Sequence, residues 1–305
     1  MRIGTGLGFA IDLNLTEEEK YSILAEVGFD TVDCMLEGSY RASIWQLPND
    51  ELRSQMERIR KIACERGIEI HQIHAPFDCV WSDDASIRET CWKAQIQAIK
   101  AASYLGATYM VMHPLTFGYR LDKEQYEQAK KKNVEYFSYL EPYLQQYGVK
   151  VAIENVFVYD THSRPCKTNC STAQALKEYV DALDSDRFGV CLDVGHAALV
   201  NQDPVEMIYE LGSKYLFATH MHDNNHLSDD HMMPGYGKLD WLSIGRALHE
   251  IEYEGVFNYE ADRTYFKLGP FRTELSLEFL KVYAELGKSI LTTSSEIVGR
   301  EFRGV

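Results

Sequence analysis

Hydrophobic and polar positions follow two different patterns along this chain. Eight short runs are mostly apolar or β-branched, which is typical of strands buried on both faces. The longer stretches between them carry apolar residues at helical spacing. The runs cover residues 2–5, 31–34, 69–74, 109–113, 150–154, 188–193, 216–220 and 256–260. This alternation predicts eight strand–helix units.

The helical stretches have clear signals at their ends. Thr16-Glu-Glu-Glu19 is a capping box, and Gly28 is placed to end the helix that follows it. Gly67, Gly106 and Gly148 are placed in the same way after later stretches. We expect helices over 16–28, 49–66, 86–105, 123–147, 204–211, 241–254 and 273–288, with a further one after the capping box at 171–174. From Ser289 on, the sequence shows no clear element.

Strands that alternate with helices, with no long linker between them, predict a parallel sheet. Eight units favour a closed barrel over a doubly wound sheet, so the predicted fold is α/β, a single-domain (β/α)₈ TIM barrel over 1–288 with a tail over 289–305. Gly4-Thr-Gly-Leu-Gly8 lacks the spacing of a dinucleotide-binding loop. We interpret it as a flexible loop after the first strand.

Composition narrows the function classes. The net charge is −15 with a pI near 5.1, which argues against nonspecific nucleic-acid binding. The seven cysteines are scattered and include no CxxC pair, so nothing indicates a disulfide scaffold. We find no secretory leader and no apolar stretch near the roughly 18 residues of a membrane span, and we expect a cytoplasmic protein with no membrane partner.

The predicted strands from the third to the eighth all end in residues that bind metals. In a closed barrel the carboxyl ends of the strands open onto one face, so these side chains should converge. Three carboxylates brought together with three imidazoles would repel one another and would lose their hydration, which is unfavourable unless a cation lies between them. The residues are His74, His113, Glu154, Asp193, His220 and Glu260. The sequence therefore predicts a divalent-metal site at the barrel mouth.

Three more potential ligands follow these strands. His196 comes three residues after Asp193, close enough for a turn to bring it back to the same centre. Asp229 and His231 lie in a stretch rich in glycine and proline, which is typical of a loop that folds over a site. His162, in the 159–170 loop, is a weaker candidate for contact with substrate.

Several fragments, in order, carry a family resemblance over nearly the whole chain. They are His74-Ala-Pro76, His113-Pro114, Ile153-Glu-Asn155, Leu192-Asp-Val-Gly-His196, His220-Met-His-Asp-Asn224, His231-Met-Met-Pro-Gly-Tyr-Gly237, Asp240-Trp241 and Tyr259-Glu260. Together they resemble the xylose-isomerase-like barrel superfamily. That group joins sugar and sugar-phosphate isomerases and epimerases to metal-dependent abasic-site endonucleases.

The two branches imply different metal contents. In the isomerase branch, the matching residues imply one Mn²⁺-like ion held by Glu154, Asp193, His220 and Glu260. In the endonuclease branch, the same four residues hold three zinc ions together with five more. Those five are His74, His113, His196, Asp229 and His231. This sequence carries all nine residues, so the resemblance alone leaves one ion or three open.

Other features favour the sugar branch. The endonucleases tend to carry asparagine at the position of His222, and the Pro234-Gly-Tyr-Gly237 loop resembles the isomerase type. No clustered basic and aromatic segment is present for gripping a bent duplex. Ketose 3-epimerases, however, carry an arginine shortly after the strand-seven histidine, where this chain has Asn224-Asn-His226. That departure puts the 3-epimerase activity in question.

The resemblance implies a metal-dependent isomerase or epimerase acting on a sugar or sugar phosphate. Glu154 and Glu260 would remove and return a proton alpha to a metal-polarised carbonyl, with Asp193 and His220 as fixed ligands. We expect His196, His74, His113 and His222 to contact substrate when one ion is bound. Mn²⁺ is the expected ion, with Zn²⁺, Mg²⁺ or Co²⁺ as alternatives.

Alternatives stay open at this point. They are an abasic-site endonuclease-like phosphodiesterase with a trinuclear zinc cluster, an inositol or glycoside lyase or dehydratase, and a non-catalytic sugar-binding barrel. The sequence does not name the sugar, and it leaves the oligomeric state open, a homo-oligomer included. Candidates for a substrate phosphate are Arg41, Lys167 and Arg263, and candidates for stacking on a sugar are Phe9, Trp81, Phe117 and Phe157.

Overall fold

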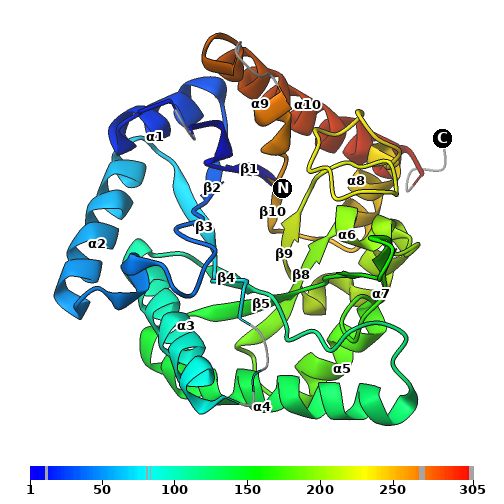
Figure 1. Cartoon of the computed structure of the whole chain (residues 1–305). Helices are drawn as coiled ribbons and strands as arrows, with labels where there is room; N and C mark the ends of the chain where they lie inside the picture. Colours follow the sequence, from blue (N-terminus) through cyan, green and yellow to red (C-terminus); the bar gives the residue numbers. More distant parts are fainter. Residues whose placement is uncertain (11–12, 80–81, 83, 268–271, 302–305) are drawn as a thin grey trace.

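The computed structural model describes residues 1–10, 13–79, 82, 84–267 and 272–301. Eight parallel strands form one sheet, in the order β10-β1-β2-β3-β4-β5-β8-β9, and helices surround it (Figure 1). This confirms the predicted (β/α)₈ barrel. The strands are β1 Arg2–Gly6, β2 Thr31–Asp33, β3 Glu69–His74, β4 Tyr109–Met112, β5 Lys150–Glu154, β8 Phe188–Asp193, β9 Leu216–His220 and β10 Val256–Tyr259.

Backbone hydrogen bonds just past the strand ends close the ring between β9 and β10. The Met221 N–H donates to the Asn258 carbonyl oxygen at 2.8 Å, and the Glu260 N–H donates to the Met221 oxygen at 3.2 Å. On the other side, β10 pairs in register with β1, Arg2 opposite Val256. Since the ring is closed, every strand delivers its carboxyl end to the same mouth.

The helices follow the predicted order and several of the predicted caps. Thr16 and Glu19 form the capping box of α1, and Gly28 ends it in the left-handed conformation at φ 93°. None of the helices in the described residues is long and apolar enough to cross a membrane. The larger helices are α1 Glu17–Val27, α2 Asn49–Glu65, α3 Ala85–Leu105, α4 Lys123–Tyr147, α5 Ala173–Leu183, α7 Pro204–Tyr215, α8 Trp241–Glu250 and α10 Arg272–Glu301.

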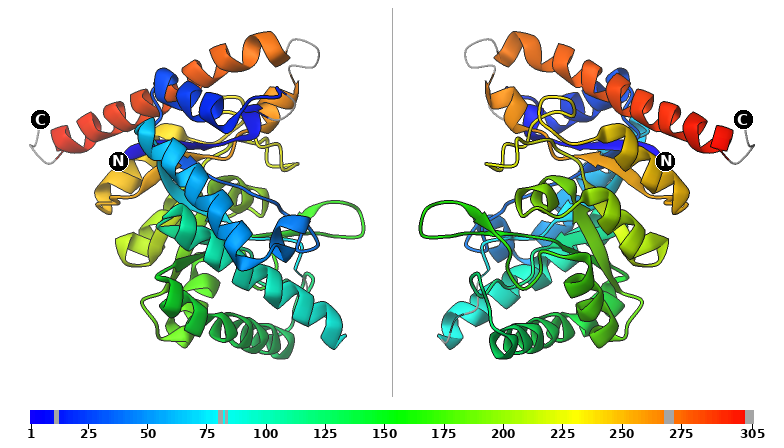
Figure 2. Two further views of the ribbon diagram at one scale, coloured as in Figure 1. Left: turned by 90° about the vertical axis from the view of Figure 1, so that its left-hand side faces the viewer. Right: turned by 90° about the vertical axis from the view of Figure 1, so that its right-hand side faces the viewer.

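The last helix differs from the prediction. α10 continues to Glu301, so the expectation of no clear element after Ser289 is wrong. Ile290 and Leu291 are buried, and the His249 ring on α8 hydrogen-bonds the Leu291 carbonyl oxygen at 3.0 Å. Packing against α8 therefore stabilises a stretch whose own apolar pattern is weak. Figure 2 shows α10, in orange to red, running along the outside of the barrel beside α1.

Smaller elements after the barrel strands were not predicted. A two-stranded antiparallel hairpin, β6 Val158–Tyr159 and β7 Pro165–Cys166, follows β5. The short helices α6 Val194–Leu199 and α9 Arg263–Lys267 follow β8 and β10. All three segments border the mouth of the barrel, where loops are free to vary without disturbing the sheet.

A small apolar cluster inside the barrel supports the site from below. It consists of Val111, Ala152, Cys191 and Ala218 and is separate from the main core. Side chains alternate along a strand, so residues two positions further on point to the same side. Two residues beyond these four stand His113, Glu154, Asp193 and His220. The two-residue period of the strands therefore places the polar side chains of the mouth in a layer directly above the apolar cluster.

Candidate metal centre

Four residues from four strand ends converge on one point, and we call them the inner group. One ligand atom from each lies within 4.8 Å of the others, and the four are Glu154, Asp193, His220 and Glu260. His220 Nδ1 stands at the middle, 3.4 Å from Glu154 Oε1 and 3.0 Å from Glu260 Oε2. Asp193 Oδ2 is 4.0 Å from the same nitrogen. The predicted convergence of these residues is observed.

The inner group has the donors and the unmet bonding needs that fit a cation. His220 Nδ1 and Glu260 Oε2 are buried, and although they lie 3.0 Å apart, neither forms a hydrogen bond of ordinary geometry with any described residue, which is costly unless an ion takes that role. Burial raises the pKa of Glu154, but the charges of His220 and His113 outweigh it and hold that pKa well below its ordinary value. Burial acts in the same way on Glu260, whose pKa His220 and His231 hold low. Both carboxylates are therefore charged and able to bind a cation.

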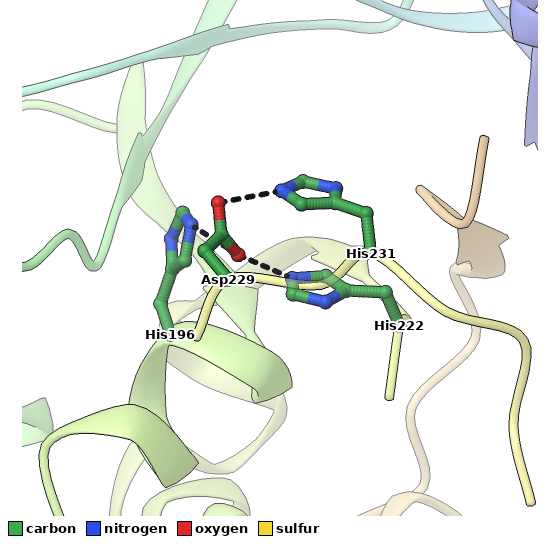
Figure 3. A group of neighbouring side chains, drawn as sticks. All are labelled: His196, His222, Asp229 and His231. Atoms are coloured by element: carbon green, nitrogen blue, oxygen red, sulfur yellow. Dashed lines mark hydrogen bonds and ion pairs between the residues drawn. The ribbon is translucent and has the colours of Figure 1, made fainter. Parts of the chain in front are cut away.

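A second set of side chains, which we call the loop group, lies beside the first. It consists of His196, His222, Asp229 and His231. Figure 3 shows the three rings around the Asp229 carboxylate, with His231 Nε2 3.0 Å from Oδ2 and His196 Nε2 and His222 Nε2 at 3.8 Å and 4.0 Å from Oδ1. The rings of His222 and His231 are stacked at 4.1 Å. His222, expected at the substrate, thus lies among potential metal ligands.

Protonation states in the loop group show how strongly it attracts positive charge. Burial lowers the pKa of His196, but Asp193 and Glu154 outweigh it and raise that pKa to about 10. Burial also lowers the pKa of His231, but the charges of Glu260 and Asp229 outweigh it and raise that pKa to about 9. The reverse holds for Asp229: burial raises its pKa, and His231 brings it down to about 2. Protons held here occupy positions that a metal ion would take.

The third set is the histidine pair, His74 and His113. Both Nε2 atoms lie 3.2 Å from Glu154 Oε2, whereas Glu154 Oε1 faces the inner group. Glu154 therefore belongs to both sets, one oxygen to each. All nine predicted ligands, with His222 as a tenth, are brought together at one mouth.

Asp33, at the end of β2, is a site residue that sequence reasoning missed. Its Oδ2 lies 3.4 Å from His220 Nε2, on the far side of the ring from the inner group. Gln72 Nε2 donates to the same oxygen at 2.8 Å, and Asn258 Nδ2 at 3.4 Å. A carboxylate behind a ligating histidine sets its tautomer and orientation. The available signal was an acidic residue next to the predicted end of the second strand.

Two further polar residues hold the ligands in place. The Asn155 side chain accepts from the Asp193 N–H at 2.7 Å and donates to the Asp193 carbonyl at 2.8 Å, which joins the ends of β5 and β8. Asp223 accepts from the Gly235 N–H and from Trp241 Nε1, both at 2.9 Å. These bonds fold the loop that carries Asp229 and His231 back over the mouth. Both residues stood in the fragments that carried the resemblance, but no role was assigned to them.

The ligands face a cavity of about 280 Å³. Residues from all three sets line it, together with Met35, Phe77, Asp262 and Arg263. Of the three candidates for a phosphate contact, only Arg263 is among these lining residues, and its guanidinium lies 3.8 Å from the Asp229 carboxylate.

The described residues that the sequence suggested for stacking on a sugar, and His162, differ in their position relative to the site. Phe157 packs edge-on against His196 at 5.1 Å, so it lies at the site. Phe9 is buried and packs on Tyr265, which is ordinary core packing, and Phe117 is partly buried against the core. His162 is exposed on the hairpin after β5. Trp81 lies outside the described residues.

A family model described as xylose isomerase-like TIM barrel matches residues 21–283. The chain belongs to this family. The match spans most of the barrel, including every residue of the inner group, the loop group and the histidine pair.

Relatives in sequence include proteins with and without an assigned activity. An uncharacterised protein of Methanocaldococcus jannaschii is 28% identical over 246 residues, 78% of this chain and 76% of the relative. An inosose isomerase of Bacillus subtilis is 29% identical over 54% of this chain and 58% of its own length. A probable endonuclease 4 of Mycoplasmoides gallisepticum is 26% identical over 56% of this chain and 57% of its own. Both branches of the superfamily are thus represented.

Solved structures agree on the fold. The IolI protein with a bound zinc atom superposes with a TM-score of 0.71 at 20% identity, covering 96% of this chain and 99% of that one. A D-psicose 3-epimerase in the presence of D-fructose gives a TM-score of 0.70 at 18% identity, covering 95% and 99%. At these identities the likeness establishes the barrel and leaves the reaction to be argued from the site.

Proposed function

We propose that this protein is a metal-dependent isomerase or epimerase acting on a sugar or polyol. The observation that carries the proposal is the approach of two carboxylates, Glu154 from β5 and Glu260 from just after β10, to the same atom, His220 Nδ1, at 3.4 Å and 3.0 Å. Both line the cavity at the mouth, so a substrate carbon held there would lie within reach of both carboxylates. The inosose isomerase and psicose epimerase among its relatives support this choice of substrate class.

The residues that would hold the ion are those of the inner group. Three carboxylates and one imidazole form a hard donor set, which suits Mn²⁺ and also accepts Mg²⁺, Co²⁺ or Zn²⁺. When bound, such an ion supplies Lewis-acid polarisation of a substrate carbonyl and thereby acidifies the neighbouring C–H bonds.

Glu154 and Glu260 would share the proton transfer. The Glu260 side chain is 19% exposed and that of Glu154 only 1%, so Glu260 is the carboxylate with access to the open cavity. One takes the proton from carbon and later releases it to water, and the other, after taking up a proton from water in the cavity, delivers it to the neighbouring carbon or to the opposite face. Two carboxylates in unlike surroundings are suited to unlike roles as base and acid.

Histidines around the same cavity are placed to bind hydroxyl groups. His74, His113 and His196 all line it, and Phe77 adds an apolar wall. Imidazole nitrogens donate or accept hydrogen bonds according to tautomer, which suits a substrate with several hydroxyls. Residues from the ends of two strands and from a helix would thus orient the sugar over Glu154 and Glu260.

A second candidate function is phosphodiester hydrolysis. The observation that favours it is the division of the ligands into three sets, with Glu154 shared between two of them. Several ions held close together can activate water and stabilise a leaving oxygen. The acidic chain, with a net charge of −15, argues against a nucleic-acid substrate.

Two measurements on the purified chain test the proposal. Elemental analysis gives the ions per chain, and incorporation of deuterium from D₂O into ketoses and inososes reports abstraction of the α-proton. We expect deuterium exchange that depends on added Mn²⁺ and is lost with EDTA. Three zinc ions per chain, no exchange with any member of the panel, and cleavage of an abasic-site duplex would replace this proposal by the second candidate.

A further inference from the structure

A larger cavity adjoins the metal centre and has no role in the proton transfer described above. Its volume is about 460 Å³, and the carboxyl ends of β1, β2 and β10 line it together with residues of α1 and α2. Met35, Glu260 and Asp262 line both this cavity and the one at the metal centre. A ligand that reacts beside Glu260 therefore has room to extend into it.

Gly6 is a reason why this cavity is open. A Cβ atom built on Gly6 meets no atom of the described residues within 4 Å, whereas one built on Gly4 or Gly8 would collide with side chains of neighbouring strands or loops. Gly6 is also absent from the residues with positive φ, so its backbone would accept a side chain. In the Gly-x-Gly-x-Gly segment, the outer glycines serve close packing and the middle one leaves space.

Charge in this cavity selects against anions. Five carboxylate residues line it, whereas Lys20 is the one cationic side chain among the described lining residues and lies 2.7 Å from Glu17. A phosphate would meet like charges without a free cation to bind it, which is unfavourable. Carboxylate oxygens accept hydrogen bonds from hydroxyl groups instead. The five are Glu17, Asp33, Glu37, Glu260 and Asp262.

Apolar side chains complete the wall. Leu7, Leu36 and Ile59 line the same space as the carboxylates. A sugar or cyclic polyol presents C–H faces as well as hydroxyls, so a wall of mixed apolar and acceptor groups matches both. The volume is within the range of small-molecule sites.

We propose that this cavity is the subsite for the non-reacting part of an unphosphorylated polyhydroxy substrate, with Gly6 providing the room. The proposal rests on the proposed function, since it takes the reacting carbon to lie beside Glu260. It deepens that function by naming the substrate class as uncharged ketoses or inososes and excluding their phosphate esters.

Binding to the Mn²⁺-loaded protein tests the subsite separately from catalysis. Calorimetry with D-fructose, D-psicose and scyllo-inosose, and with D-fructose 6-phosphate as the charged counterpart, compares the parent with Gly6→Ala and Gly6→Leu. We expect an uncharged member to bind the parent more tightly than the phosphate does. The leucine variant should weaken that binding by about tenfold or more, and alanine by less, as a side chain fills the space. Mn²⁺ affinity, read by electron paramagnetic resonance, should stay unchanged in both.

A variant that reverses one charge at the cavity tests the exclusion of phosphate independently of Gly6. Glu37 is exposed on the cavity rim, and Glu37→Lys should shift preference toward D-fructose 6-phosphate. Glu127 is exposed on α4 and does not line the cavity, so Glu127→Lys makes the same charge change as a control and should shift nothing.

The outcomes separate this proposal from the proposed function. Tighter binding of the phosphate to the parent, or full affinity in Gly6→Leu, overturns the subsite, and deuterium exchange by the parent then leaves the isomerase function standing. Binding that depends on Gly6 without any exchange keeps the subsite and overturns the isomerase function. Neither binding nor exchange with any member of the panel overturns both.

Discussion

The inner group and the loop group lie side by side at one mouth, yet they are built differently. The inner group has three carboxylates and one imidazole, each at or just after the end of a barrel strand. The loop group has three imidazoles and one carboxylate, and three of its members, His222, Asp229 and His231, lie on the segment between β9 and α8. The first is positioned by the sheet itself and the second depends on how a loop folds.

That difference predicts different chemistry. With its imidazole neutral, the inner group carries three negative charges and needs a cation to be stable, and its oxygen donors suit a hard ion. With its imidazoles neutral, as metal binding requires, the loop group carries one negative charge and three softer nitrogen donors, a set typical of zinc. We expect the inner position to bind the ion that the reaction requires and the loop position to bind an ion that is dispensable for proton transfer.

The largest effect is expected from Glu154→Gln. It removes a proposed acid–base group and a charge that the inner group and the histidine pair share. Deuterium exchange should fall by roughly 10²–10⁴-fold. Glu127→Gln on the exposed face of α4 is the matched control and should exchange at the parental rate. A Glu154→Gln variant that exchanges as fast as the parent would contradict the proposed mechanism.

Asp33→Asn tests whether the inner group depends on the carboxylate behind His220. Loss of such a partner typically weakens metal affinity by roughly 10–100-fold. Titration of the apoprotein with Mn²⁺, followed by electron paramagnetic resonance, measures this directly. Asp30→Asn is the control. Asp30 stands just before β2, and its carboxylate accepts a hydrogen bond from the Ile3 backbone N–H at 2.9 Å, so its role is to join two strands and not to hold a ligand. Equal Mn²⁺ affinity in both variants would remove Asp33 from the site.

Asp229→Asn should separate the two groups most clearly. The variant loses the one carboxylate of the loop group, and the ligands of the inner group remain. We expect any zinc bound at the loop position to be lost. Mn²⁺ binding and deuterium exchange should change by no more than about threefold, because Asp229 is not one of the four residues of the inner group. Loss of exchange equal to that of Glu154→Gln would mean that the two groups act as one multinuclear site.

The smallest effect is expected from Trp241→Phe. It removes the bond from Trp241 Nε1 to Asp223 at 2.9 Å, although backbone N–H donors to that carboxylate remain. The free energy of unfolding should fall by about 1.5–3 kcal/mol, as for other hydrogen bonds to charged groups. Denaturant unfolding measures it. Mn²⁺ affinity should be unchanged, and a parallel loss there would mean that the loop also supports the inner group.

Much of the site could be predicted from the chain because strand ends are visible in a sequence. His74, Glu154, Asp193 and His220 each close an apolar run, and closure of a barrel then implies that they meet. Asp33 escaped prediction because the run was extended by one residue to Cys34, and because the pairing of β2 with β3 shifts register between Val32 and Asp33. Such a shift decides which side chains face inward, and no local pattern reveals it.

The division of the ligands into sets was likewise invisible in the sequence. His222 was expected at the substrate, but its ring stacks on His231 beside Asp229. That contact depends on the path of the loop after β9, which hydrogen bonds to Asp223 hold in place. Loop paths follow from such long-range bonds and not from periodicity.

The sequence by itself determined the barrel, the order of its elements and the convergence of the strand-end ligands, because strand and helix periods are local and the closed sheet has one mouth. Only the tertiary structure decided that Glu154 serves two sets of ligands, that Asp33 stands behind His220 and that Gly6 opens a cavity beside Glu260. Those features arise where residues far apart in the chain approach within a few ångströms, and the distances depend on the packing of the whole barrel.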